Sequence, residues 1–371
     1  MILSRGVRRM ETDRRSNVAE NQQLAVGAAP RRRGMRLGAH YLPTYIAALD
    51  GPVPEFYGHL FQQMEELDAL GFDDVWVTEH HFYEYGGTIS APPVFLAAAA
   101  RTTHRINIGV AISILPLHDP VRVAEAYAMV DAISNGRLQL GVGRGNQPDF
   151  ASSGIPYEET ARRLQEGTEV IRRAWSDDEL SFHGEMFDFE GIRVLPKPVH
   201  RPHPPIWVAA SRSDDTFRWA GRNGFNLMTL PYSQDPAVLG PAIQNYRDAL
   251  VEAGHDPASR EILGKFHIYV ADTAEAAIQE ARPYLNNYRD LVDARSPRRT
   301  REGRDPRAYE AQLAVGNIIA GDPKRCVDII HRWREKLGLT TISGTFHFGG
   351  MPQEMALKNI RLFAEQVMPY V

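Results

Sequence analysis

The 371-residue chain has a single cysteine, Cys326, and lacks any run of about 18 apolar residues. One cysteine excludes an internal disulfide and a metal site made of cysteine pairs, which fits a reducing compartment. Without a long apolar run, no segment is expected to span a membrane. The formal net charge of −4 gives no polycationic signature for nucleic acid. We therefore expect a cytoplasmic protein that binds neither nucleic acids nor membranes.

The first 34 residues differ from the rest: they are rich in arginine, as in the triplet 31–33, and lack the apolar segment of a secretory signal. We expect a disordered tail, or a start assigned too early with the natural start at Met35. A basic arm that binds acidic surfaces is the alternative interpretation. The folded domain is accordingly expected over residues 35–371.

From Met35 onward, short apolar runs alternate with stretches of helical period. Eight runs are predicted to be strands: Leu37–Leu42, Asp74–Glu79, Ile106–Leu115, Arg137–Val142, Pro205–Ala210, Phe225–Leu230, Ile262–Ala271 and Thr341–Phe348. Helices between successive strands indicate a parallel sheet, because parallel neighbours need crossover connections. An open, doubly wound sheet is the main alternative. Eight regular units in one α/β domain favour a closed (β/α)8 TIM barrel.

Two insertions interrupt this alternation, one after the fourth strand and one after the seventh. Asp177–His203 places glycines and prolines between aromatic residues, which predicts a hairpin and a loop. Asp290–Tyr309 is rich in Arg, Asp and Pro and is predicted to be a mobile loop. Long connections of this kind in a compact domain often serve as lids.

Polar residues follow three of the predicted strands, at the carboxyl ends where barrel enzymes place their active sites. Ser213 is a natural N-cap for the helix after the fifth strand, with Thr216 one turn further on the same face. Unpaired amides at a helix start suit a phosphate, but an ordinary serine cap explains the same residues. Arg144 stands between Gly143 and Gly145, which allow a tight turn, and its guanidinium can bind a phosphate. A solvated arginine in a turn is the alternative.

Glu79, His80 and His81 end the second strand. Adjacent strand residues point to opposite sides, so His80 and His81 cannot both face the barrel axis. This spacing disfavours a metal site, for which two histidines on one face are needed. A histidine at the end of a barrel strand suits proton transfer near neutral pH. Local hydrogen bonding is the simpler explanation for His81.

Taken together, these segments resemble the bacterial-luciferase-like family of flavin-dependent monooxygenases. The similar segments occur in the family's order: TEHHFYEYG at 78–86, LPLHDPVR at 115–122, SNGR at 134–137, GRG at 143–145, VAASRS at 208–213 and LFAEQVMPY at 362–370. The resemblance implies a (β/α)8 barrel that binds reduced FMN (FMNH2). It also implies oxidation of a small organic substrate by O2 through a flavin peroxide, with a separate flavin reductase as partner, and a homodimer.

The resemblance also assigns residues. His80 matches the family's catalytic histidine, and we expect Glu79 to orient it. The residues that match phosphate-binding or flavin-contacting positions are Arg144, Ser213, Thr216, either Arg162 or Arg163, and the pair Ala111-Ile112, whose peptide bond is expected to be cis.

Two departures from the family limit what the resemblance implies. Gly143 occupies the place of the reactive cysteine of luciferase, so light emission is not expected. The segment after the seventh strand also differs, which puts aldehyde specificity in doubt. Three alternatives stay open: a deazaflavin-dependent oxidoreductase, a non-catalytic flavin-binding protein and a metal-dependent barrel hydrolase.

Overall fold

The computed structural model describes residues 34–150, 153–233, 236–294, 312–313 and 316–371. The expectations for the arginine-rich first 34 residues therefore fall almost wholly outside the described residues. Within the described part, no helix combines the length and the hydrophobicity that crossing a bilayer demands.

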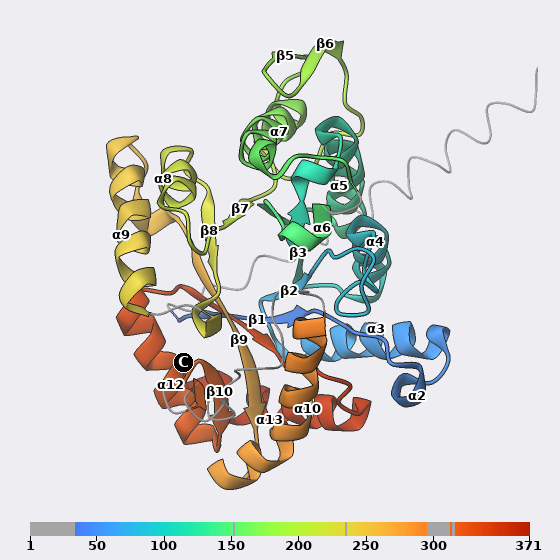
Figure 1. Cartoon of the computed structure of the whole chain (residues 1–371), viewed down its shortest axis with the longest axis vertical. Coiled ribbons are helices and arrows are strands. Elements are labelled where there is room, and N and C mark those ends of the chain that lie inside the picture. The colour runs from blue at the N-terminus through green and yellow to red at the C-terminus, as the bar shows by residue number, and fades with distance from the viewer. Residues whose placement is uncertain (1–33, 151–152, 234–235, 295–311, 314–315) are drawn as a thin grey trace, which may run out of the picture. The chain divides into compact units, whose positions relative to one another are not determined.

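Eight parallel strands of the described residues close into a barrel, and the predicted (β/α)8 TIM barrel is confirmed (Figure 1). In chain order they are β1 (Arg36–Tyr41), β2 (Asp74–Val77), β3 (Asn107–Ile114), β4 (Leu138–Gly143), β7 (Ile206–Ala209), β8 (Asn226–Thr229), β9 (Ile262–Val270) and β11 (Thr341–Thr345). Each strand pairs with the next one, and β11 pairs back with β1. A further strand, β10 (Ile318–Gly321), pairs with β9 and was not predicted.

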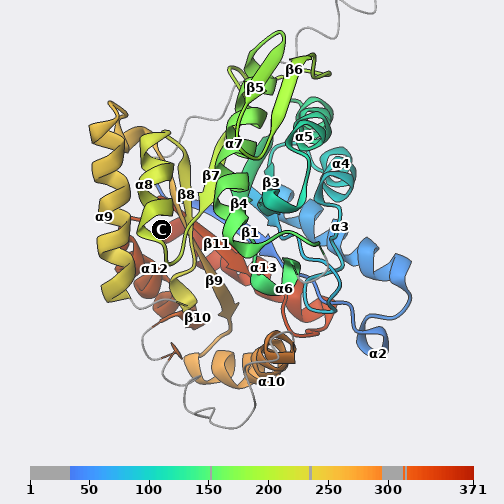
Figure 2. The same cartoon turned by 45° about the horizontal axis from the view of Figure 1, so that its top comes forward.

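Helices surround the strands, as Figures 1 and 2 show. Their bounds are α2 (Ala47–Asp50), α3 (Val53–Leu70), α4 (Pro92–Thr102), α5 (Pro120–Ser134), α6 (Gln147–Phe150), α7 (Thr160–Ser176), α8 (Asp214–Arg222), α9 (Pro236–Glu252), α10 (Ala274–Ala294), α12 (Pro323–Leu337) and α13 (Gln353–Gln366). Short 3-10 helices are η2 (Leu115–Leu117), η3 (Tyr157–Glu159), η4 (Pro231–Ser233), η5 (Pro257–Ser259) and η6 (Met368–Tyr370).

Helix α5 shows how local sequence sets these bounds. The Asp119 carboxylate accepts hydrogen bonds from the first-turn amides of Val121 and Arg122, and Pro120 occupies the first helical position, where no amide is needed. The helix ends where Asn135 takes a left-handed conformation with φ 58°, which asparagine tolerates better than most residues.

The two predicted insertions have different outcomes. The first contains the antiparallel hairpin of β5 (Leu180–His183) and β6 (Asp188–Ile192), as predicted, and it lies beside α7 (Figure 2). The second prediction is wrong in its first part, because α10 continues through residues 290–294. Leu285 and Tyr288 are buried and Leu291 packs against the same cluster, so the helical period outweighs the charged composition. Residues 295–309 lie outside the described residues.

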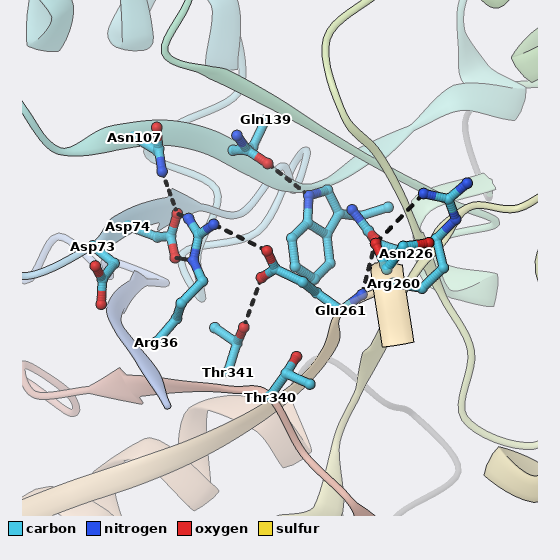
Figure 3. Close-up of polar contacts among 12 residues, drawn as sticks. Arg36, Asp73, Asp74, Asn107, Gln139, Asn226, Arg260, Glu261, Thr340 and Thr341 are labelled. Carbon is cyan, nitrogen blue, oxygen red and sulfur yellow. Dashed lines mark hydrogen bonds and ion pairs between the residues drawn. The ribbon is translucent and has the colours of Figure 1, made fainter. Parts of the chain in front are cut away.

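A polar network closes the amino-terminal end of the barrel (Figure 3). Arg36 on β1 pairs with the fully buried Asp74 on β2 and, at 3.1 Å, with Glu261. Asn107 donates to Asp74 at 3.0 Å, and the Thr341 hydroxyl donates to Glu261 at 3.1 Å. Opposite charges and matched donors satisfy each buried group, so this end of the barrel is sealed.

Two tryptophans fill the barrel above this network. Trp76 and Trp207 are both fully buried, with ring centroids 5.3 Å apart in an edge-to-face arrangement. Gly109 on β3 provides the room, because a Cβ there would lie 2.5 Å from the Trp76 ring. The Trp207 indole donates to Gln139 at 2.9 Å. Side chains therefore occupy the barrel interior up to the level of these two rings. A ligand site is expected nearer the carboxyl ends of the strands.

We predict that Gly109→Ala lowers the free energy of unfolding by about 1–3 kcal/mol, because the added methyl displaces the Trp76 ring. The matched control is Gly58→Ala in helix α3, where a Cβ meets nothing within 4 Å. That variant should gain about 0.5–1 kcal/mol from helix propensity. Urea unfolding of both variants measures the difference, and equal values for the two would contradict the packing described here.

Candidate active site

The predicted site residues follow strands that are neighbours in the barrel. His80 follows β2, Arg144 follows β4 and Ser213 follows β7, and the strands run in the order β2-β3-β4-β7. Because all strands are parallel, their carboxyl ends lie at the same end of the barrel. The structure therefore brings these three segments to one rim.

His80 is buried and continues the interior face of β2. Side chains alternate along an extended segment, so His80 shares the face of Trp76 and Thr78. Its Nδ1 donates to Asp149 Oδ1 at 3.3 Å, and Asp149 is itself buried in α6. The other Asp149 oxygen accepts from the Asn146 amide at 2.8 Å. The loop after β4 thus fixes the orientation of the His80 ring.

Glu79 was expected to orient His80, but its side chain lies on the opposite face of the same segment. Its Oε1 accepts hydrogen bonds from His81 Nε2 at 2.9 Å and His118 Nε2 at 2.6 Å. Burial opposes ionisation of Glu79, but these hydrogen bonds outweigh it and lower its pKa to about 2. The carboxylate that contacts His80 is Asp149, 69 residues away in the sequence.

The ligand atoms of Glu79, His81 and His118 lie within 4.8 Å of one another, a grouping that a metal ion can use. However, ligands on a zinc ion stand about 3.3 Å apart, given bonds of about 2.0–2.1 Å and tetrahedral angles. Separations of 2.6 and 2.9 Å are those of hydrogen bonds. Hydrogen bonding therefore accounts for the arrangement, in agreement with the local explanation for His81.

We predict that Glu79→Gln lowers the free energy of unfolding by about 1–3 kcal/mol, because a buried charge-assisted acceptor is lost. The hydrogen bond to Glu79 raises the pKa of His81 above its ordinary value of 6.5. The stabilisation is therefore complete below that value and is lost as the pH rises through the raised pKa.

The pH dependence of this variant gives the measurement. Urea unfolding should show a larger loss at about pH 5.5 than at about pH 8.5. A loss of equal size at both pH values would contradict an ionic contact between Glu79 and His81. His104→Ala, at an exposed histidine, serves as the control and should change neither value.

Arg144 is held in place before any ligand binds. Its Nε and one terminal nitrogen donate to the Thr160 hydroxyl at 3.0 and 2.8 Å, and its guanidinium lies 4.7 Å from the centre of the Tyr157 ring. The side chain is half-buried. A guanidinium oriented in this way presents its remaining N–H groups in a fixed fork, which suits a phosphate.

The structure separates Arg162 from Arg163. Thr160 and Arg163 are three residues apart on α7 and share a helix face, so Arg163 lies on the side that Arg144 contacts. Arg163 bonds to Glu159 at 3.1 Å. Arg162 instead pairs with Glu185 of the hairpin turn at 3.3 Å, and both of these side chains are largely exposed. Of the two candidates left open by the sequence, Arg163 is the one on the helix face of Thr160, and its guanidinium lies 5.8 Å from the centre of the Phe187 ring.

At the start of α8, the hydroxyl of the N-cap residue is not used by the helix itself, as a phosphate site would require. Ser213 is the N-cap residue with an extended backbone, and its hydroxyl makes no hydrogen bond to the amides of its own helix. Its carbonyl accepts from Thr216 N at 3.0 Å. Asp214 in the first turn would repel a phosphate, but its carboxylate bonds to Arg218 at 2.9 Å and to Asn245 on α9.

A shelf of small and aliphatic residues spans β3, β4 and β7 at the same rim. The Ala111-Ile112 peptide bond is cis, as expected. A Cβ on Gly143 would lie 2.3 Å from Ile112 Cδ1 and 3.4 Å from the Ala209 Cβ, so a larger residue there would require the Ile112 side chain to shift. The shelf, made of Ala111, Ile112, Gly143 and Ala209, packs against the buried tryptophans.

Comparison with known proteins decides the family. The sequence model of the luciferase-like monooxygenases matches residues 35–341. The chain belongs to the luciferase-like monooxygenase family. The predicted family is thereby confirmed, and the matched region covers most of the compact unit Met35–Val371.

Two relatives within the family have named activities. A 4-hydroxyprotoasukamycin monooxygenase from Streptomyces nodosus subsp. asukaensis is 29% identical over 74% of this chain and 76% of that protein. The oxygenase component of a flavin-dependent trigonelline monooxygenase from Acinetobacter baylyi is 30% identical over 63% of this chain and 66% of that protein.

A solved structure in the family shows the same architecture over almost its whole length. Monooxygenase RslO1 from Streptomyces bottropensis superposes with a TM-score of 0.84 at 29% identity, covering 90% of this chain and 99% of that one. Together with the family match, these relatives identify the scaffold as that of an oxidoreductase of the monooxygenase class.

Sequence reasoning missed Asp149, Thr160 and Tyr85. Asp149 lies in the four-residue helix α6, and Thr160 holds Arg144 across 16 residues. The Tyr85 ring lies 6.0 Å from the His80 ring. No periodicity marks such residues, although Tyr85 lies within the family-like segment at 78–86. The nearest signal for Asp149 is its position shortly after the Gly-Arg-Gly turn.

Proposed function

We propose that this protein is a monooxygenase that binds reduced FMN at the carboxyl end of its barrel and uses O2 to oxidise a small organic substrate. The observation that carries the proposal is the convergence of three features at one rim. These are the oriented Arg144, the open start of α8 and the buried His80–Asp149 pair. Each feature alone has a structural explanation, but the three together match the parts of a flavin phosphate site beside a proton-transfer group.

The chain's own residues fit FMN. Arg144, Arg163, Ser213 and Thr216 would bind its phosphate through guanidinium, hydroxyl and helix-terminal amide donors. The apolar shelf of Ala111, Ile112, Gly143 and Ala209 would receive its flat ring, since glycine at 143 lets the Ile112 side chain pack closely against β4. When bound, reduced FMN supplies the electrons that activate O2, and the protein supplies position and shielding.

His80 is the proton-transfer group in this proposal. A carboxylate accepts only, so the bond to Asp149 requires the proton on Nδ1 and fixes the tautomer of the ring. In this tautomer the imidazole would exchange a proton with the reacting molecules near neutral pH. Asp149 is a positioning residue, because it holds the ring and its tautomer. Glu79 supports the same segment from the outer face through His81 and His118.

Tyrosines shield the His80 side of the rim. The Tyr85 hydroxyl hydrogen-bonds to the Tyr288 hydroxyl at 2.8 Å, and Tyr288 lies on α10, just before the segment that was predicted to be an insertion. Both rings are buried. We infer that this pair keeps bulk water from the reacting groups.

We further propose a separate flavin reductase as partner and a homodimer as the assembly. The trigonelline monooxygenase relative is described as an oxygenase component, which supports a two-component arrangement. Helices α4 and α5 leave large apolar side chains exposed, namely Val94 at 73% and Met129 at 52%. Exposed apolar residues on adjacent helices are typical of a protein interface.

We predict that Arg144→Ala weakens FMN binding at least tenfold and riboflavin binding much less, because riboflavin lacks the phosphate. Arg163→Ala should behave in the same way. Arg162→Ala, one residue away, is the matched control and should leave both affinities unchanged. Fluorescence titration with the two flavins measures the affinities. Equal losses for FMN and riboflavin would place these arginines away from the phosphate.

We predict that His80→Ala leaves FMN affinity within about twofold of the wild type while turnover falls by about 100-fold or more, the usual range of general acid–base catalysis. Asp149→Asn should lower kcat with little change in KM, because the ring is misoriented while binding is kept. Substrate-dependent O2 uptake with FMNH2, over a panel of aldehydes, ketones and alkanes, gives the readout. Unchanged turnover in His80→Ala would refute the assignment.

The same assay separates the remaining candidates. A deazaflavin-dependent enzyme of this fold would reduce or oxidise its substrate without consuming O2, and a non-catalytic protein would bind FMN without turnover. Metal analysis of the purified protein tests the hydrolase alternative at the cluster of Glu79, His81 and His118.

A further inference from the structure

The barrel wall opposite the shelf is polar. The shelf belongs to β3, β4 and β7, whereas β9, β11, β1 and β2 carry polar residues toward the barrel interior. We call this set the polar wall, and it consists of His40, Thr78, Lys265, His267, Ser343 and Thr345.

Strand register places these residues side by side. Lys265 is level with Ser343, and His267 is level with Thr345. Ala39 is paired with Gly344, so His40 and Thr345 come next to each other one position later. The alternate residues of β9, Ile262, Phe266 and Ile268, belong to the outer core, which confirms that Lys265 and His267 face inward.

Several polar atoms of the wall have no partner although they are fully buried. Within the described residues, His40 Nδ1, Ser343 Oγ and Thr345 Oγ1 make no hydrogen bond. His40 Nε2 is bound to the Thr78 hydroxyl at 2.8 Å. A buried polar group without a partner costs about 1–3 kcal/mol. Three such groups on one wall, beside a buried lysine, indicate a polar ligand that completes them.

The hydrogen-bond donors of the polar wall suit a ligand with a negatively charged acceptor. Lysine offers only donors, and the serine, threonine and histidine groups beside it can donate as well. Burial lowers the pKa of Lys265 to about 7, and burial together with the charge of Lys265 lowers the pKa of His267 to about 3. An anion next to Lys265 would favour the ammonium form.

The position of the wall points to the substrate as the ligand. The order of strands around the barrel puts β2, which leads into His80, between the shelf and the rest of the wall. A flavin on the shelf and a substrate on the wall would therefore have His80 between them. Next to the wall, the rings of Tyr288 and Phe348 lie 4.4 and 5.3 Å from His267, which suits an aromatic or otherwise flat apolar body.

We propose that the polar wall binds an anionic oxygen of the substrate, a carboxylate or an acidic phenol or enol, with Lys265 as its counter-ion. That this anion is the substrate rests on the proposed function, but the binding of an anion at the polar wall does not. The substrate class is thereby narrowed from small organic compounds in general to acidic molecules with a flat apolar body.

Direct binding to the flavin-free protein tests this inference. The probes are benzoate for the carboxylate, 4-nitrophenol for the acidic hydroxyl, whose absorbance reports its ionisation, and benzyl alcohol as the neutral control. The wild type should bind at least one anionic probe tenfold or more tighter than benzyl alcohol. Lys265→Met should abolish this preference and leave the affinity for benzyl alcohol unchanged. Lys265→Arg should restore part of it.

A second variant provides a test that does not depend on whether the Lys265 variants fold. Thr345→Val removes an unsatisfied buried hydroxyl, so it should fold at least as stably as the wild type while the anionic probe binds about fivefold more weakly. Equal affinity of the wild type for charged and neutral probes would overturn the proposal. So would a Lys265→Met variant that loses FMN affinity instead of probe affinity. Failure of O2 uptake, by contrast, would refute the monooxygenase proposal alone.

Discussion

Pairing of β8 with β9 closes the sheet on itself, and the position of every functional group follows from that closure. A closed parallel barrel has two chemically different ends. At the amino-terminal end, Arg36 forms ion pairs with both Asp74 and Glu261, and two edge-to-face tryptophans occupy the barrel interior above them. The carboxyl ends are left as the place where side chains can meet a ligand.

Two walls of the barrel interior differ in polarity: one is apolar and the other is polar. Glycine and alanine on β4 and β7 form a smooth shelf, because any larger side chain at 143 would collide with Ile112. Across the barrel, Lys265 and its neighbours form a buried wall of donors. A fold that buries an amine and leaves several polar atoms unsatisfied gives up stability, and binding of a complementary molecule offsets that loss.

Glu79 and His80, which follow β2, have different environments because successive side chains point to opposite faces. His80 faces inward and meets Asp149, whereas Glu79 faces outward and holds His81 and His118. In the proposed function the inner pair moves a proton, and the outer cluster holds the segment that carries it. Reversal of the register by one residue would exchange the two environments. The outer cluster therefore serves the site without lining it.

The sequence by itself determined the barrel, the family and most of the candidate binding residues. Strand runs, helix stops such as Asn135-Gly136 and ordered motifs such as Gly143-Arg144-Gly145 depend on residues close in the chain. The cis bond at Ala111-Ile112 and the hairpin within 177–203 also agree with expectation.

Only the tertiary structure decided which side chains meet. Asp149 reaches His80 across 69 residues, and His118 reaches Glu79 across 39. Arg163 differs from Arg162 by the face of α7 that it occupies, which no composition reveals. The polar wall combines residues of β1, β2, β9 and β11, so its register exists only after the barrel has closed. Local pattern specifies elements, but contacts between distant residues depend on how the elements pack.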